Sequence, residues 1–315
     1  MVREAIVTEA EMEQQRILER RARREARRER QRAENIGRAE RMHEARLAYE
    51  RALPEPGLAA GKALVPEQQV GPPELHVGCS GWFYWHWRDQ FYPPETPSNR
   101  WFEHYATQFR TVELNAPFYS WPTVATVKTW VRQAGRRKFV YTVKVSELIT
   151  HVKRFCGTKT LVRDFGHIAD LLGPYMGCFL FQLPPSYHYT PARLKTILAQ
   201  LDPTRRNVVE FRHKSWWDEQ VFGAFREAKV AFCSSSGPRL PDELVRTADD
   251  VYVRFHGKTR WYRHDYSKEE LAVWVQRIRE SGAKRVWVYF NNDRECYAIK
   301  NARELLRQLK RSSDH

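Results

Sequence analysis

Charged and polar side chains stand at the ends of several strand-like segments of this sequence. In Val251-Tyr-Val-Arg-Phe-His-Gly257 the apolar residues alternate with Tyr252, Arg254 and His256, which is the two-residue period of an extended strand. One face is apolar throughout, and the other becomes cationic only near its C-terminal end. This pattern predicts a strand that is buried on both sides and carries Arg254 and His256 to a site at its tip.

The same arrangement recurs along the chain. The polar residues that fall near strand ends, on the face opposite the apolar one, are Ser80, Glu113, Asn115, Lys144, Gln182, Glu210, Arg212, Arg254, His256 and Asn291. Any one of them could be a satisfied structural group, and Glu210 with Arg212 could form a simple ion pair. Buried charges are costly unless they are paired or used, so their repetition over six or more strands predicts a functional pocket.

The leading hypothesis is an enzyme that acts on a small or sugar-like anionic substrate bearing phosphate or carboxylate. Arg212 and Arg254 would bind the anion, because a guanidinium group matches the geometry of a phosphate and of a carboxylate. Glu113 or Glu210, with His256, would supply the general acid and base. The reaction would be that of a hydrolase, a lyase or an isomerase.

Other chemistries stay open at this point. The amides of Asn115, Gln182 and Asn291 would orient substrate hydroxyl groups, and Lys144 is a Schiff-base nucleophile if its pKa is depressed. The two glutamates also invite a glycosidase-like acid/base pair, although cationic neighbours suit that reaction poorly. We expect no metal and no cofactor, since no spaced His/Cys/carboxylate motif occurs and the cations would repel a divalent ion.

These side chains need a scaffold that brings many strand ends together. The expected strands are Leu75–Ser80, Arg110–Asn115, Lys138–Lys144, Gly177–Leu183, Asn207–Arg212, Lys229–Ser234, Val251–His256 and Lys284–Asn291. The expected helices are Asn99–Gln108, Val124–Ala134, Leu161–Leu172, Pro191–Leu201, Asp218–Ala228, Lys268–Ser281 and Cys296–Leu309, with mostly loop from Ser235 to Asp250. This alternation predicts an α/β fold, a (β/α)8 TIM-type barrel with its site at the strand C-termini. A doubly wound sheet is the alternative, but neither a GxGxxG turn nor a P-loop occurs.

The composition favours an anionic partner. The chain of 315 residues has a formal charge of +15 and a pI of about 9.7. Residues 1–73 contribute only +2 of this charge, and the remainder contributes +13. Five unpaired-looking cysteines, no apolar stretch of membrane-spanning length and no signal-peptide core predict a soluble cytoplasmic protein. The oligomeric state is left open.

A charged arm precedes the barrel. Residues 1–53 are rich in helix formers, with nine Arg and three Glu between Arg16 and Arg32, and Thr8 with Glu11 fits a capping box. Its apolar residues form too thin a stripe for a core-facing helix, so a solvated helix is expected, with a nucleic-acid-binding arm as the functional alternative. Residues 54–73 resemble a Pro/Gly linker, and residues 74–311 would form the barrel.

Aromatic residues cluster after the first strand. The run Trp82-Phe-Tyr-Trp85-His-Trp87 fits either a stacking wall over the pocket or a hydrophobic plug on the barrel rim. Trp216, which follows Arg212, poses the same choice. Trp82 and Trp216 are therefore substrate-binding candidates.

Seven ordered motifs identify a family resemblance. They are VGCSGW (77–82), TVELNAPFY (111–119), KVSELITH (144–151), FQLPPSY (181–187), VEFRHKSW (209–216), YVRFHG (252–257) and YFNND (289–293). Together they resemble the YecE-like family, also called domain of unknown function 72, over about residues 75–310. The resemblance implies a (β/α)8-type barrel and leaves the reaction open.

The resemblance also bears on individual residues. Its motifs contain the substrate-binding candidates Tyr119, His151 and Asn292, and Tyr266 completes the set. The chain departs from the family pattern in its Arg-rich arm and in Cys233-Ser-Ser-Ser236, where family members usually carry an Asp after the sixth strand.

A different class of function competes with the enzyme. The basic barrel, the aromatic loop and the Arg-rich arm would together suit a nucleic-acid-binding protein, by phosphate contacts and base stacking. A scaffold that binds a partner through the arm is a third reading. The expected partners are thus a small anionic ligand or a nucleic acid, and no membrane.

Overall fold

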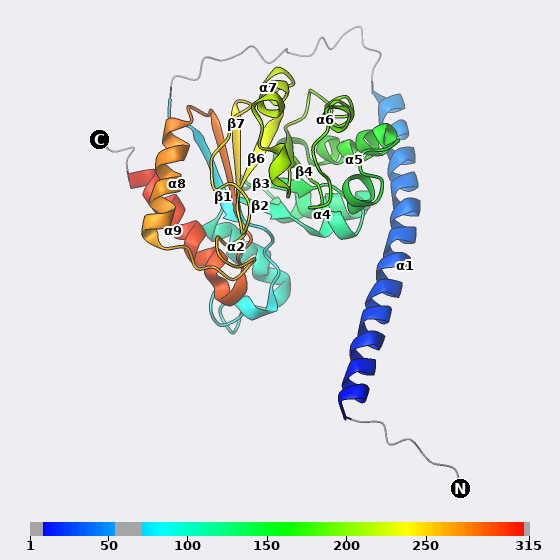
Figure 1. Ribbon diagram of the computed structural model, residues 1–315, viewed down its shortest axis with the longest axis horizontal. Helices are drawn as coiled ribbons and strands as arrows, with labels where there is room; N and C mark the ends of the chain where they lie inside the picture. The colour runs from blue at the N-terminus through cyan, green and yellow to red at the C-terminus, as the bar shows by residue number, and fades with distance from the viewer. Residues whose placement is uncertain (1–8, 54–70, 312–315) are drawn as a thin grey trace.

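The computed structural model describes residues 9–53 and 71–311, and eight parallel strands form a nearly closed barrel within them (Figure 1). Neighbouring strands pair in the order β1-β8-β7-β6-β5-β4-β3-β2. The strands are β1 (Glu74–Cys79), β2 (Thr111–Leu114), β3 (Val140–Lys144), β4 (Met176–Gln182), β5 (Asn207–Glu210), β6 (Ala231–Ser236), β7 (Asp250–Phe255) and β8 (Arg285–Phe290). The predicted TIM-type barrel is confirmed.

Helices follow the strands and cover the outside of the barrel. They are α2 (Trp101–Gln108), α3 (Ala116–Tyr119), α4 (Val124–Ala134), α5 (Lys159–Leu172), α6 (Pro191–Leu198), α7 (Glu219–Glu227), α8 (Lys268–Glu280) and α9 (Tyr297–Arg311). The connection from β6 to β7 is loop, as expected. The short α3 was not expected, and β6 extends two residues further than predicted because Ser235 and Ser236 pair with Arg254 and Phe255 of β7.

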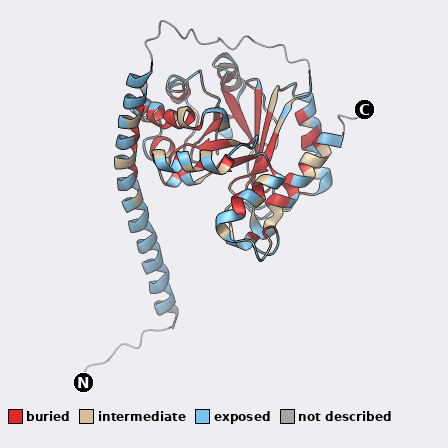
Figure 2. Ribbon diagram, turned by 180° about the vertical axis from the view of Figure 1, so that it is seen from behind, coloured by how far each residue is buried: buried red, intermediate tan, exposed pale blue. Residues whose placement is uncertain are grey.

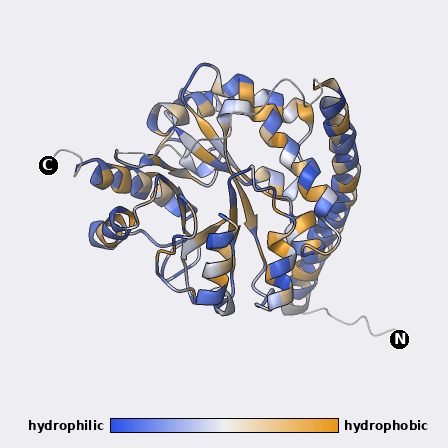
Figure 3. Ribbon diagram, turned by 90° about the horizontal axis from the view of Figure 1, so that it is seen from above, coloured by the Kyte–Doolittle hydropathy of each residue, from blue (hydrophilic) through white to orange (hydrophobic). Residues whose placement is uncertain are grey.

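Each strand is buried on both faces, as the alternation predicts (Figure 2). Residues of one face, including Leu180, Tyr252 and Tyr289, fill the barrel interior as a separate apolar cluster. Residues of the other face, such as Val253 and Phe290, join the larger core between sheet and helices. Seen from above, apolar segments gather at the sheet and on the inward sides of the helices (Figure 3). This layering is typical of a barrel whose interior is a packed core.

Tyr105 of α2 joins β1 to β2, the one pair of neighbouring strands in the described chain that shares no backbone ladder. Its hydroxyl donates to the carbonyl of Thr111 at 3.0 Å and accepts from the amide of Cys79 at 2.8 Å. Gly78 permits this approach, because a Cβ there would lie 2.4 Å from the Thr111 oxygen. The bridge joins the last residue of β1 to the first residue of β2, and Ser80 and Glu113 follow one and two residues later.

Helix α1 (Glu9–Ala52) is long and lies against the barrel for only part of its length (Figure 1). Ala39 and Met42 are buried, and Arg46, 5% exposed, donates from Nε to Oδ1 of buried Asp164 on α5 at 2.8 Å. The expectation of a solvated helix is therefore wrong for the C-terminal half of α1, because a stripe of mixed polar and apolar residues packs against the barrel there. Thr8, of the suggested capping box, and the proposed linker up to residue 70 lie outside the described residues.

The remaining features concern the chain as a whole. All five cysteines are free thiols, and Cys79, Cys178 and Cys233 are buried in strands. Among the helices of residues 9–53 and 71–311, none combines the length and the apolar character needed to cross a membrane.

Candidate functional site

Arg254 is the centre of a buried ion-pair network at the C-terminal end of the barrel. From β7, its Nη2 lies 2.5 Å from Oε1 of Glu113 on β2, and its Nη1 lies 2.6 Å from Oε2 of Glu210 on β5. All three side chains are at most 1% exposed. One guanidinium thus holds two carboxylates that come from opposite parts of the barrel.

Each carboxylate has further partners. Glu113 accepts hydrogen bonds from the hydroxyls of Tyr252, at 2.6 Å, and Ser80, at 2.7 Å. Oε1 of Glu210 lies 2.6 Å from Nε of Arg212, at an angle unfavourable for a hydrogen bond. Two neutral hydroxyl donors therefore stabilise the charge of Glu113 beside Arg254, whereas a second cation, Arg212, stabilises that of Glu210.

The charges around Glu210 set its protonation state. Burial acts to raise the pKa of Glu210, but Arg212 and Arg254 outweigh it and hold that pKa well below the usual range. Nε2 of His256 lies 2.9 Å from the same carboxylate, and burial together with the two arginines holds the pKa of His256 well below its usual value. At neutral pH the glutamate is ionised and the histidine is uncharged.

Lys144 stands apart from this network. It ends β3, is 8% exposed, and its Nζ lies 3.9 Å from the centre of the Phe118 ring. This amine makes no hydrogen bond or ion pair with any residue of 9–53 or 71–311. Burial, reinforced by the charge of Arg254, lowers the pKa of Lys144 to about 7. The side chain is therefore an amine poised between its protonated and neutral forms near physiological pH.

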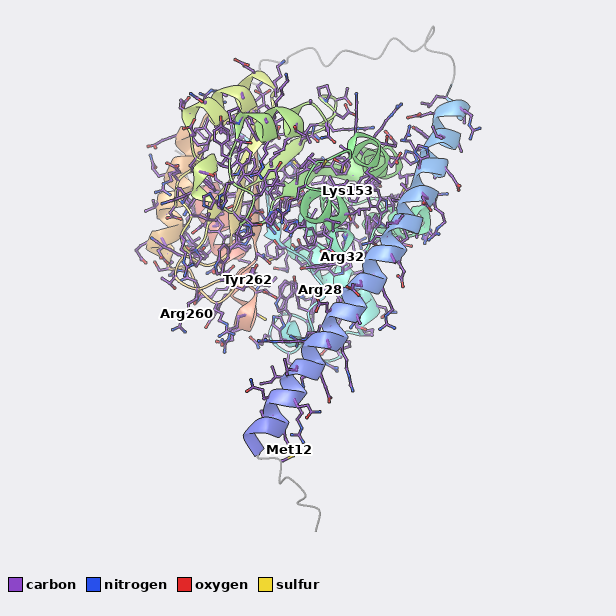
Figure 4. The ribbon with its side chains drawn as sticks, turned by 45° about the vertical axis from the view of Figure 1, so that its right-hand side comes forward. Met12, Arg28, Arg32, Lys153, Arg260 and Tyr262 are labelled. Carbon is purple, nitrogen blue, oxygen red and sulfur yellow. The ribbon has the colours of Figure 1, made fainter. Side chains whose placement is uncertain are left out.

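Arg212 and Arg254 of this network line the floor of a cavity of about 1000 Å³, and the fully buried Glu113 and Glu210 hold them there. The cavity is lined from the barrel by Tyr84, Asn115, Phe118, Tyr119, Lys144, Glu147, His151, Gln182, Arg212, Arg254, Tyr262 and Asn291, and from α1 by Arg24, Arg27, Arg28, Gln31 and Arg32. Its size is at the upper end of the range for small-molecule sites. Figure 4 shows Arg28 and Arg32 where α1 runs beside the barrel, whereas Met12 lies on the part that extends beyond it.

Polar groups on the cavity wall are held by neighbouring backbone and side chains. Asn115 donates to the carbonyl of Ser80 at 3.2 Å, and Gln182 donates to that of Leu183 at 2.7 Å. The rings of His151 and Phe118 pack nearly at right angles, with their centres 4.9 Å apart. Burial and nearby Lys144 lower the pKa of His151 to about 4. His151 is thus a neutral imidazole at pH 7.

Most of the residues predicted from strand ends meet at this one place. Glu113, Lys144, Glu210, Arg254 and His256 share the floor or its immediate support. Asn115, Tyr119, His151, Gln182, Arg212 and Asn291 line the cavity. Ser80 contributes through its hydrogen bond to Glu113.

Four other candidates lie elsewhere. Trp216 is fully buried, stacks on Phe211 at 3.8 Å and donates to the carbonyl of Tyr187, so it packs a loop onto the barrel. Trp82 is half-buried and packs edge-on against Phe102. Neither belongs to the cavity lining, which corrects both assignments to substrate binding.

Tyr266 and Asn292 are the other two. Tyr266 is 3% exposed, and its hydroxyl bonds to Ser236 and to the amide of Gly257. Asn292 is fully buried and donates to the carbonyl of His264. Both stabilise the loop between β7 and α8, and neither lines the cavity.

The structure also adds lining residues that the sequence reasoning missed. Phe118, Glu147 and Tyr262 come from loops or short helical turns after strands, where alternation gives no signal, whereas Tyr84 belongs to the aromatic run for which a wall over the pocket is one of the two expectations. The sequence predicts that the arginines of α1 are solvated or bind nucleic acid, not that they line the cavity. Arg24, Arg27, Arg28, Gln31 and Arg32 have the spacing of one helix face, which is the signal that could have found them.

Comparison with known proteins agrees with this architecture. The family model described as "Protein of unknown function DUF72" matches residues 76–315. The UPF0759 protein YunF of Bacillus subtilis is 25% identical over 278 residues, which cover 75% of this chain and 94% of that protein.

Two solved structures share the fold. A DUF72 family protein from Thermotoga maritima is 26% identical, with a TM-score of 0.67, over 77% of this chain and all of that one. One from Enterococcus faecalis is 19% identical, with a TM-score of 0.65, over 75% of this chain and 95% of its own. Because the family model spans most of the sequence and the barrel matches its solved members, this chain belongs to the DUF72 family.

Proposed function

We propose that the cavity is the active site of an enzyme that acts on a small anionic substrate, with Lys144 as the group that exchanges a proton with it. The observation that carries this proposal is the position of the Lys144 amine. It lies in the cavity wall and makes no hydrogen bond or ion pair with the described residues, whereas the neighbouring charged groups are paired.

The charge of the cavity supports an anionic substrate. On the floor, Glu113 and Glu210 balance Arg254 and Arg212, so Lys144 adds the excess charge. On the rim, Glu147 faces several arginines of α1 and lies 3.5 Å from Arg32. Phosphate or carboxylate groups match guanidinium and ammonium donors.

The ion pairs of Glu113 and Glu210 with Arg254 argue against the general acid and base roles expected for the two glutamates. Glu113 and Glu210 were candidates for general acid and base, but both accept from Arg254. They hold that guanidinium in place, and a carboxylate pair with a cation between them is a poor match for a glycosidase water site. We therefore assign them, with His256, to positioning and keep proton transfer for Lys144, whose amine would also form an imine with a carbonyl substrate.

Binding of simple anions tests the proposal. We expect inorganic phosphate and ribose 5-phosphate to raise the melting temperature of the wild-type protein. Lys144→Met should abolish most of the shift, and Lys153→Met, at an exposed lysine beyond the cavity (Figure 4), should leave it unchanged. An absence of any shift over a panel of phosphates and carboxylates would reject the anion site.

Nucleic-acid binding remains the second candidate, because the N-terminal half of α1 is exposed and rich in arginine. It predicts that the logarithm of the affinity for RNA or DNA falls linearly with the logarithm of salt concentration. A protein that ignores both polymers at moderate ionic strength would exclude it.

A further inference from the structure

Helix α1 is fixed in register on the barrel by Asn35, which is fully buried. Its side chain donates to the carbonyl of Tyr119 at 2.9 Å and accepts from the amide of Trp121 at 2.9 Å. Arg38 adds a hydrogen bond to the Ser120 hydroxyl, next to the same segment. The contact is therefore specific to the loop after β2, which borders the cavity.

The same helix face continues over the cavity. Positions 24, 28, 31 and 35 recur at spacings of three and four residues, so the anchor at Asn35 dictates where the preceding turns point. Arg24, Arg27, Arg28, Gln31 and Arg32 all line the cavity. Rotating or sliding α1 would break both Asn35 hydrogen bonds, so these arginines are built into the site.

Most of the positive charge of these arginines has no ion-pair partner among the described residues. Arg32 lies 3.5 Å from Glu147, but no salt bridge joins Arg24, Arg27 or Arg28 to a carboxylate in the described part of the chain. Arg24, Arg27 and Arg28 are exposed lining residues of α1, whereas the lining residues Lys144 and Arg212 are largely buried where β3 and β5 end. The cavity thus presents two cationic regions.

We infer that α1 completes the binding site, and that the ligand is a small molecule with at least two anionic groups, one bound near Lys144 and Arg212 and another beneath the arginines of α1. This inference rests on the proposed anion site and names its substrate class, exemplified by a polyphosphate or a sugar bisphosphate. The family match begins at residue 76, so the second anion region belongs to a segment outside the matched domain.

Two matched variants separate this role from the general charge of the helix. The triple change Arg24→Gln, Arg27→Gln and Arg28→Gln removes three lining arginines, and Arg23→Gln, Arg30→Gln and Arg41→Gln removes three that do not line the cavity. Both keep good helix formers and lower the net charge equally. Circular dichroism and melting temperature of both triple variants would test that α1 and the barrel remain folded.

Calorimetric titrations with inorganic phosphate and with tripolyphosphate, at constant ionic strength, provide the test. In the lining variant we expect tripolyphosphate to bind about tenfold more weakly or worse, with phosphate within about twofold of wild type. The control variant should bind both as wild type does. Asn35→Ala, which changes no charge, should lower tripolyphosphate affinity in the same selective way.

The outcomes divide cleanly. If wild type binds phosphate and tripolyphosphate equally, or if both triple variants lose tripolyphosphate affinity to the same extent, α1 is no part of the site and the inference fails while the anion site stands. If wild type binds neither anion, the proposed function itself fails.

Discussion

Replacing Arg254 by Met would leave two buried carboxylates without their shared cation. The guanidinium lies 2.5 Å from Glu113 and 2.6 Å from Glu210, and all three side chains are at most 1% exposed. Glu210 would keep Arg212 at 2.6 Å. Among the described residues, Glu113 would keep as partners the neutral hydroxyls of Tyr252 and Ser80 alone.

The structure therefore predicts one uncompensated buried charge, not two. Removing one partner of a buried ion pair costs about 3–5 kcal/mol, which is a large part of the roughly 5–15 kcal/mol of a typical domain. We expect Arg254→Met to lower the free energy of unfolding by that amount at pH 7.5. Adding Glu113→Gln should recover most of the loss, and adding Glu210→Gln should recover little, because Glu210 still has Arg212.

Urea unfolding at pH 7.5, followed by tryptophan fluorescence and circular dichroism, measures these differences. Arg254→Lys, which keeps the charge, provides a milder variant in case Arg254→Met does not fold. A loss below about 1 kcal/mol for Arg254→Met would refute the reasoning. So would a rescue by Glu210→Gln that equals or exceeds the rescue by Glu113→Gln.

Three further predictions concern other parts of the account. Lys144→Met should stabilise the fold more at pH 6 than at pH 9. Because the pKa of Lys144 is lowered to about 7 in the folded protein, burying the ammonium destabilises the fold fully below pH 7, and this destabilisation fades as the pH rises to the unfolded pKa of 10.5. Melting curves that show the reverse order would contradict this prediction. Asn35→Ala should speed tryptic cleavage within α1 while the barrel stays resistant, whereas Ile36→Ala, at a residue 52% exposed, should not. Trp216→Ala should cost about 3–5 kcal/mol of stability without changing phosphate affinity, because Trp216 is fully buried away from the cavity; a selective loss of affinity would restore it to the site.

The sequence was sufficient for the barrel and for the floor of the site, because a strand has a simple period. Knowing that Val253 and Phe255 face the outer core places Arg254 inside, and parallel strands bring Glu113 and Glu210 to the same end. The pairing of the three could not be read from that pattern. It depends on how far each side chain reaches across the interior, and it is the reason we propose positioning roles for the two glutamates.

The loops and the N-terminal arm do not have the two-residue alternation of a strand, so the direction of their side chains cannot be predicted in this way. Trp216 and Trp82 lie in connections where their direction is set by packing on Phe211 and Phe102. The docking of α1 depends on Asn35, a polar residue that meets Tyr119 and Trp121 more than 80 positions later in the chain. Hydropathy does not mark such a contact, so the charged run by itself predicts a solvated helix.

The titration of the Lys144 amine tests the central claim most directly. Nitrogen-15 NMR of the lysine side chains, with the signal assigned by its loss in Lys144→Met, gives this pKa with and without inorganic phosphate. We predict a pKa of about 7 in the free protein and a higher value with phosphate, since a bound anion favours the ammonium form. A pKa near 10.5 that phosphate does not change would contradict the account.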